Sequence, residues 1–229
     1  MKDIIVWAVH TPAGALAWIT AIVAMCAYKG SPLHRKAGSG FTASMMVMLV
    51  SGVVAAYLKD SIDDMMLGAI VLYTLFTAWL AVHHKENETS ALEGIALLWV
   101  VGFAMTAFSI SMSLIESDTP PITYLIWGGF AMLCALGDIL NLGPHGLSGT
   151  QRLIRHVWRI GFSFVWAALA FADKVVKLVG TNIESMQEEQ LLMIVAAPTL
   201  LILAAIVNWI ASILTSGCSA SRLFGVTHR

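Results

Sequence analysis

Residues 65–82, MMLGAIVLYTLFTAWLAV, decide the fold class of this chain. These 18 residues carry no charge, and an apolar helix of this length can cross the hydrocarbon core of a bilayer, which is about 30 Å thick. Five further runs of at least 18 residues also lack a charged side chain, and only 12% of the 229 residues are charged. Soluble domains average about 25%. The composition therefore excludes a soluble helical domain and indicates an integral membrane protein.

Hydrophobic stretches on both sides of this run predict an all-α integral membrane bundle of seven transmembrane helices that forms one domain, residues 1–229. The predicted spans are 4–28, 37–58, 65–82, 94–115, 122–140, 153–179 and 191–214.

The sixth span differs from the others. Only 13 uncharged residues separate Arg159 from Asp173, a helical rise of about 20 Å. A helix that crosses the membrane here must therefore hold charges inside the apolar slab, where each is costly unless it is paired or wetted. If the segment instead lay on the membrane surface, six spans would remain and the C-terminus would change sides.

The distribution of lysine and arginine predicts the orientation of the bundle. With the N-terminus outside, nine of the 13 basic residues fall at cytoplasmic ends of the spans and four at outer ends, as the positive-inside rule requires. Seven spans then place the C-terminus in the cytoplasm.

Polar residues inside the predicted spans are the candidates for a functional site. Asp138 lies near the cytoplasmic end of the fifth span, and Arg155, His156 and Arg159 lie near the start of the sixth. The two arginines are four residues apart and share a helix face. We expect Asp138 to pair with one arginine in a buried pocket, with His156 as the group that changes charge near neutral pH; Asn208 in the seventh span could reach a similar depth. Alternatively, the arginines extend to lipid headgroups and Asp138 is structural.

A second polar position lies in the outer half of the predicted bundle. His10 lies about two turns into the first span, and Pro12 leaves the carbonyl of Ala8 without its helical donor. Asp173 ends the sixth span in the same leaflet. These groups predict an outward-facing proton or ligand site. Alternatively, His10 is a neutral interfacial histidine and Asp173 lies among the headgroups.

The first cytoplasmic loop is basic, because it contains Lys29, Arg35 and Lys36. His34 lies among these residues, directly before Arg35. The loop could bind an anionic lipid headgroup or phosphate, or fold His34 back onto the inner pocket. Otherwise it serves only to set the topology. No cysteine or histidine spacing in the chain predicts a metal site, and no nucleic-acid partner is expected.

Several classes of membrane protein are excluded by missing residues. Residues 191–214 contain no lysine for a retinal Schiff base and no histidine for an intramembrane zinc hydrolase. His10 and His156 fall in opposite leaflets and cannot share one haem, whereas His34 and His156 could if the loop entered the bundle. No nucleophile–base pair at helical spacing supports an enzyme.

Three stretches carry distinctive residues: His10-x-x-x-Gly14, the loop with Lys29-Gly30 and His34-Arg35-x-x-Gly38, and Arg155-His156-x-Trp158-Arg159, with Met46 between the second and third. As a set they resemble a family of predicted bacterial polytopic membrane proteins of unknown function. The resemblance covers roughly the first 60 residues and residues 138–171. It implies a multi-helix fold in the cytoplasmic (inner) membrane and no reaction, substrate or cofactor.

Polar residues in both leaflets favour translocation of a small solute, an ion or a proton along a path lined by the sixth span. One alternative is a membrane redox protein that binds haem or a quinone through His34 and His156. Another is a non-catalytic subunit or assembly factor whose basic loops contact a partner protein or anionic lipid. A homo-oligomer is compatible with each of these functions.

Overall fold

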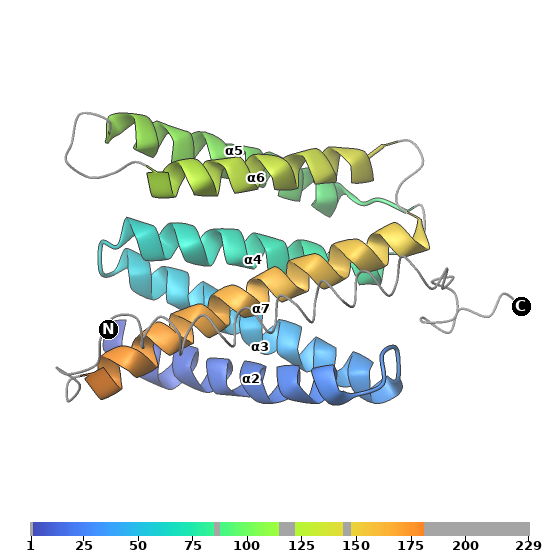
Figure 1. Cartoon of the computed structure of the whole chain (residues 1–229), viewed down its shortest axis with the longest axis horizontal. Helices are drawn as coiled ribbons and strands as arrows, with labels where there is room; N and C mark the ends of the chain where they lie inside the picture. Colours follow the sequence, from blue (N-terminus) through green and yellow to red (C-terminus); the bar gives the residue numbers. More distant parts are fainter. Residues whose placement is uncertain (1, 85–87, 115–121, 144–147, 181–229) are drawn as a thin grey trace, which may run out of the picture.

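The computed structural model describes residues 2–84, 88–114, 122–143 and 148–180, with side chains described in these ranges from Ile4 to Phe171. All elements in these ranges are helical (Figure 1). In chain order they are α1 (Lys2–Ile5), the π-helix η1 (Val6–His10), α2 (Thr11–Cys26), α3 (Pro32–Tyr57), α4 (Ile62–His83), α5 (Ala91–Ser113), α6 (Ile122–Asn141) and α7 (Gly149–Gly180). The predicted seventh span, 191–214, lies outside the described residues.

Five helical segments are long and apolar enough to cross a membrane. They are Val6–Cys26, Pro32–Tyr57, Ile62–His83, Ala91–Ser113 and Ile122–Asn141. They agree with the first five predicted spans to within a few residues at each end. The described residues confirm the all-helical prediction, and their apolar helices fit a multi-pass membrane protein, while the count of seven spans and the orientation stay predictions.

Serines mark the starts of four helices. Helices α3, α4, α5 and α7 begin directly after Ser31, Ser61, Ser90 and Ser148. Serine favours this position because its hydroxyl can accept a hydrogen bond from a free N–H group of the first turn. Ser148 and Gln151 bond reciprocally in this way, at 2.9 and 3.4 Å between backbone nitrogen and side-chain oxygen. This cap explains why α7 begins at Gly149, several residues before the apolar run.

Helix α7 is longer than the sixth predicted span and is not among the five apolar candidates, so whether it crosses the membrane stays a prediction. The helix contains 32 residues, which corresponds to about 48 Å. The 13 uncharged residues are only its central part, with Arg155 and Arg159 on the preceding turns. In Figure 1 this helix runs obliquely past α4, from the end where α4 finishes toward the end where η1 and α2 begin.

The helices pack in a chain of neighbours. Close backbone approaches join α2 to α3, α3 to α4, α4 to α7 and α5 to α6, whereas α5 meets α4 over a smaller area. The α5–α6 hairpin contacts α4 and α7 largely through long side chains. The Phe130 ring of α6 stacks on Phe162 of α7 with centroids 4.3 Å apart, and Trp127 meets Trp166 at 4.9 Å. These rings fill the space that close helix contact would otherwise occupy.

Candidate functional site: a buried ion cluster between α4, α6 and α7

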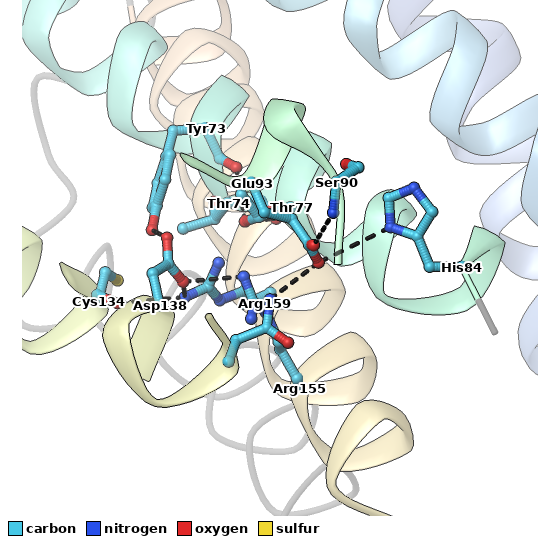
Figure 2. A network of polar contacts seen from close by, with 11 residues as sticks. Tyr73, Thr74, Thr77, His84, Ser90, Glu93, Cys134, Asp138, Arg155 and Arg159 are labelled. Carbon is cyan, nitrogen blue, oxygen red and sulfur yellow. Dashed lines mark hydrogen bonds and ion pairs between the residues drawn. The ribbon is translucent and has the colours of Figure 1, made fainter. Parts of the chain in front are cut away.

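Asp138 is the centre of a buried ion cluster near the end of α6. Its Oδ1 accepts a hydrogen bond of 2.8 Å from Nη2 of Arg155 and one of 2.5 Å from Nη2 of Arg159 (Figure 2). The sequence predicts a pair with one arginine, and the structure joins the carboxylate to both. Arg155 is 6% exposed and Arg159 1% exposed, so neither guanidinium extends to the headgroups as the alternative interpretation requires.

Tyr73 of α4 contacts both charges of the cluster. Its hydroxyl donates to Oδ2 of Asp138, so each carboxylate oxygen accepts a hydrogen bond. The guanidinium carbon of Arg159 lies 5.3 Å from the centre of the Tyr73 ring and 5.1 Å from that of Trp158, within the range of a cation–π interaction. The Tyr73 ring also stacks on Trp99 of α5 at 5.7 Å. Tyr73 thereby links the cluster to the α5–α6 hairpin.

The two guanidinium groups use few of their hydrogen-bond donors. Asp138 engages Nη2 of each, and Nη2 of Arg159 also approaches the carbonyl of Cys134 at 3.4 Å. The Nε and Nη1 atoms of Arg155 and Arg159 are buried and have no hydrogen-bond partner among the described residues. Buried polar groups are nearly always hydrogen-bonded. These four nitrogens are therefore the least satisfied part of the site.

A second buried carboxylate lies nearby, at the start of α5. Glu93 is 4% exposed. Its Oε2 accepts from the backbone N–H of Ser90 at 2.9 Å, and its Oε1 accepts from the amide of Asn141 at 2.8 Å. Nδ1 of His84 lies 3.7 Å from the same Oε1. Asn141 follows Asp138 by about one helical turn, so α6 carries neighbouring contacts to both carboxylates.

Buried hydroxyl groups extend the polar contacts along the interface of α4 and α7. Thr74 and Ser163 are 0% exposed, and their hydroxyl oxygens lie 3.0 Å apart. The Ser163 hydroxyl also bonds to the carbonyl of Arg159 at 2.9 Å. Thr77 is likewise buried and donates to the carbonyl of Tyr73 at 2.8 Å. The polar region therefore continues one turn beyond Arg159.

His156 lies apart from Asp138, which differs from the expected common pocket. Its Nδ1 is 2.9 Å from the carbonyl oxygen of Ala78 on α4. A carbonyl oxygen only accepts, so Nδ1 carries the proton. His156 therefore faces α4, and among the described residues it forms no hydrogen bond with Asp138.

His34 is held by α2 and does not reach the ion cluster through a hydrogen bond. Its Nδ1 is 2.9 Å from the carbonyl oxygen of Ala24, and its backbone N–H donates to Ser31. Lys29 donates from Nζ to the same Ala24 carbonyl at 3.2 Å and to that of Met25 at 2.7 Å. Burial lowers the pKa of Lys29. The first loop is thus tied to the end of α2.

Arg35 and Lys36, by contrast, are exposed. The structure places both near the start of α3, which begins at Pro32 and not at residue 37 as predicted, because Ser31 caps the helix. Their binding to an anionic lipid stays a prediction.

His10 bonds to a neighbouring helix. Its Nδ1 is 2.8 Å from the carbonyl oxygen of Met48 on α3. The missing N–H of Pro12 is accommodated by the π-helical turn Val6–His10, a common irregularity before such a break. The side chain of Asp173 and all of Asn208 lie outside the described residues. The predicted outer site therefore stays a prediction.

Comparison with known proteins gives no relative from which a function can be carried over. No protein-family model, curated protein or solved structure matches this chain. The function is therefore argued from the geometry of the cluster. Among the residues that the structure describes, no group of three or more histidine, cysteine, aspartate or glutamate side chains is placed to hold a metal ion.

Tyr73, Glu93 and Asn141 belong to the site but were not among the predicted residues. Each had a weak signal in the sequence. Tyr73 is a polar aromatic residue at the centre of an apolar span, and Ser90-x-x-Glu93 has the spacing of a helix-capping box. Asn141 follows Asp138 by three residues and so adjoins it on a helix. None of these signals indicates which helices meet.

Proposed function

We propose that the protein translocates a small solute, an ion or a proton along a polar path lined by α7. The supporting observation is the cluster of Asp138, Arg155 and Arg159, buried between α4, α6 and α7. Each charge inside the hydrocarbon region costs at least about 2.5 kcal/mol unless it is paired or wetted. A cluster of three charges at this depth is therefore more readily explained by a functional role than by stability.

The packing of the helices supports a way in which the path could open. The α5–α6 hairpin has few close backbone contacts with the α4–α7 pair, and the hydrogen bonds of Asp138 cross between these two groups of helices. A proton that binds Asp138, or an anion that binds an arginine, would compete with the ion pairs. Loss of the ion pairs would let the hairpin move against α7, which is the kind of two-state element that gating requires.

Proteoliposomes provide the test. Proton flux is followed with an enclosed pH-sensitive dye, and solute flux by osmotic light scattering. We expect flux above that of empty liposomes, and a decrease of about tenfold or more in Asp138→Asn, because the variant can neither titrate nor form the ion pairs. Asp63→Asn is the matched control, since Asp63 is exposed and also accepts a hydrogen bond from a tyrosine, Tyr124.

A flux that Asp138→Asn leaves unchanged, with the variant folded by gel filtration and circular dichroism, would contradict the proposed path. The same holds if neither assay detects flux for the unaltered protein over a panel of monovalent cations, anions and neutral solutes.

A specific observation also favours the redox alternative. His34 and His156 each bond through Nδ1 to a backbone carbonyl, an arrangement that orients metal-ligating histidines and leaves Nε2 available. Haem held by this pair would give a Soret band in the purified protein, and a spectrum without that band excludes the haem version of this alternative.

We propose the orientation and location that the sequence predicts, with the N-terminus outside and the bundle in the cytoplasmic membrane. The supporting observation is that Lys29, Arg35 and Arg152 occur at one end of the bundle, where α2 ends and α3 and α7 begin. Positive charge at one end is typical of the cytoplasmic side.

A further inference from the structure

We propose that Arg155 and Arg159 bind a small oxyanion, a phosphate or carboxylate group, through guanidinium nitrogens that Asp138 does not engage. This inference names the substrate class of the ion cluster and so rests on the proposed function. The supporting observation is the number of N–H groups on Arg155 and Arg159 that have no acceptor in the part of the chain that the structure describes. A guanidinium has five N–H groups, and the hydrogen bonds of both arginines to described residues are made by Nη2 alone.

The remaining donors are numerous and buried. Nε carries one hydrogen and Nη1 two, so each arginine retains three N–H groups on these atoms. All four atoms are shielded from solvent and have no acceptor among the described residues. Arg155 and Arg159 are 6% and 1% exposed. A ligand that satisfies these donors must bring several acceptor atoms into the interface of α6 and α7.

The charge balance selects an anion. Two guanidinium groups share one carboxylate, Asp138, which leaves one positive charge in excess within hydrogen-bonding distance. Tyr73 does not supply a negative charge, because its hydroxyl donates to Asp138. Cys134 lies nearby as a buried thiol and contributes its backbone carbonyl. A cation would meet repulsion from two arginines, whereas an anion in contact with them would be attracted by both; Glu93 offsets part of this positive charge from a greater distance.

Glu93 attracts Arg155 at longer range but does not replace the ligand. Among the described residues Glu93 forms no hydrogen bond with either arginine; its two oxygens instead accept from Ser90 and Asn141. The carboxylate thus lowers the electrostatic cost of the arginine pair without satisfying its N–H groups. A bound oxyanion would do both.

The shape of guanidinium favours oxygen acceptors over a halide. Its planar N–H groups match the oxygen spacing of carboxylate and phosphate, which it binds through paired hydrogen bonds. A spherical halide cannot present separate acceptors to both arginines in this way. The oxyanion could come from solution or from a lipid headgroup, and the two sources share the same phosphate chemistry.

Thermal unfolding of the purified full-length protein tests the inference. The protein is placed in phosphatidylcholine nanodiscs in a cationic buffer and titrated with inorganic phosphate, acetate or chloride at constant ionic strength. A ligand that binds only the folded state raises Tm with its concentration. We expect Tm to rise with the logarithm of the phosphate or acetate concentration once that concentration exceeds Kd, and to change little with chloride. A second set of nanodiscs contains phosphatidylglycerol, to detect headgroup binding.

Lysine substitutions distinguish the contribution of the guanidinium N–H groups to anion binding from the contribution of the positive charge. Arg155→Lys and Arg159→Lys retain a positive partner for Asp138 but remove Nε and Nη1. We expect each to weaken phosphate binding at least tenfold. Arg152→Lys is the matched control on the preceding turn of α7, where Nε of Arg152 donates to the carbonyl of Ala81; it should bind phosphate like the unaltered protein.

Hydrogen–deuterium exchange of the unaltered protein gives a second measurement that needs no variant. Phosphate should protect peptides covering residues 134–141 and 152–163. Protection confined to other regions, an equal Tm rise in chloride, or full phosphate binding by both lysine variants would overturn the inference. It is also overturned if phosphate, acetate and phosphatidylglycerol all leave Tm unchanged. A response to phosphatidylglycerol alone supports the phosphate chemistry and identifies the headgroup as its source.

The outcomes distinguish this inference from the proposed function. Phosphate binding that depends on Arg155 and Arg159, without flux in proteoliposomes, would support the anion site and contradict translocation. Proton or cation flux that depends on Asp138, without anion binding, would contradict the anion site and leave translocation standing.

Discussion

Arg159 and Asp138 are joined by a hydrogen bond of 2.5 Å between Nη2 and Oδ1, and each side chain is only 1% exposed. Neither charge is in contact with bulk water, so each depends on the other for its solvation. Taking two charges out of water is costly, and removal of one partner leaves the other buried without compensation. The pair is therefore a sensitive point of the bundle as well as the centre of the candidate site.

The first prediction concerns this pair. Asp138→Ala or Arg159→Ala should each destabilise the protein by about 3–5 kcal/mol, because each leaves an unpaired buried charge. The double variant Asp138→Asn with Arg159→Gln removes both charges and should recover part of the loss. Recovery should be incomplete because Arg155 also loses its carboxylate. Unfolding in mixed detergent micelles measures the difference, and single variants as stable as the unaltered protein would refute the buried pair.

The second prediction concerns the hydroxyl of Tyr73. Tyr73→Phe keeps the ring on Trp99 and over Arg159 but removes the hydrogen bond to Oδ2 of Asp138. A buried carboxylate oxygen without its donor should cost about 1–3 kcal/mol, measured by the same unfolding assay. The proposed path predicts a lower flux as well.

Tyr124→Phe provides the matched control for Tyr73. The Tyr124 hydroxyl donates to Oδ1 of Asp63 at 2.5 Å, and Asp63 is exposed. Water can replace the lost donor there, so we expect a cost below about 1 kcal/mol. Equal costs for the two variants would mean that the Asp138 carboxylate is better solvated than its burial indicates.

The sequence predicts the first five apolar helices, because a bilayer core imposes a minimum apolar length. It also predicts that Asp138 pairs with one of the two arginines, because an isolated charge in such a segment is costly; the structure adds the second arginine. The start of α7 was missed, since its first turns are polar and are stabilised by the cap at Ser148.

The wider contacts of the cluster could not be predicted, because they depend on how helices are rotated about their axes. His156 was expected beside Asp138 on the ground that it adjoins Arg159 in helical spacing. It follows Arg155 directly, however, and successive residues of a helix point about 100° apart. The rotation that directs Arg155 to α6 therefore turns His156 toward Ala78 of α4. The contact between Tyr73 of α4 and Asp138 of α6 likewise depends on how two helices far apart in the sequence are rotated toward each other.

The third prediction tests the packing of α5 against α6 through two adjacent glycines. A Cβ at Gly128 would lie 2.7 Å from Cε1 of Phe108, whereas a Cβ at Gly129 would meet nothing within 4 Å. Gly128→Ala should therefore destabilise the protein by about 1–3 kcal/mol through overpacking. Gly129→Ala should be neutral or stabilising by up to about 1 kcal/mol, because alanine favours the helix over glycine. Unfolding of the two variants side by side measures the contrast, and equal effects would contradict this contact.

The fourth prediction concerns the membrane crossing of α7. Its 32 residues are long enough to span the bilayer, so a reporter fused after Gly180 should lie outside and one fused after Arg229 should lie in the cytoplasm. Alkaline phosphatase is active only outside and green fluorescent protein fluoresces in the cytoplasm, so paired fusions determine each side. Fusions after Lys59 and Glu86 are controls for the outer and cytoplasmic sides of α4. A cytoplasmic Gly180 with an external C-terminus would mean that α7 lies along the membrane surface, and the buried arginines of the proposed path would then need another explanation.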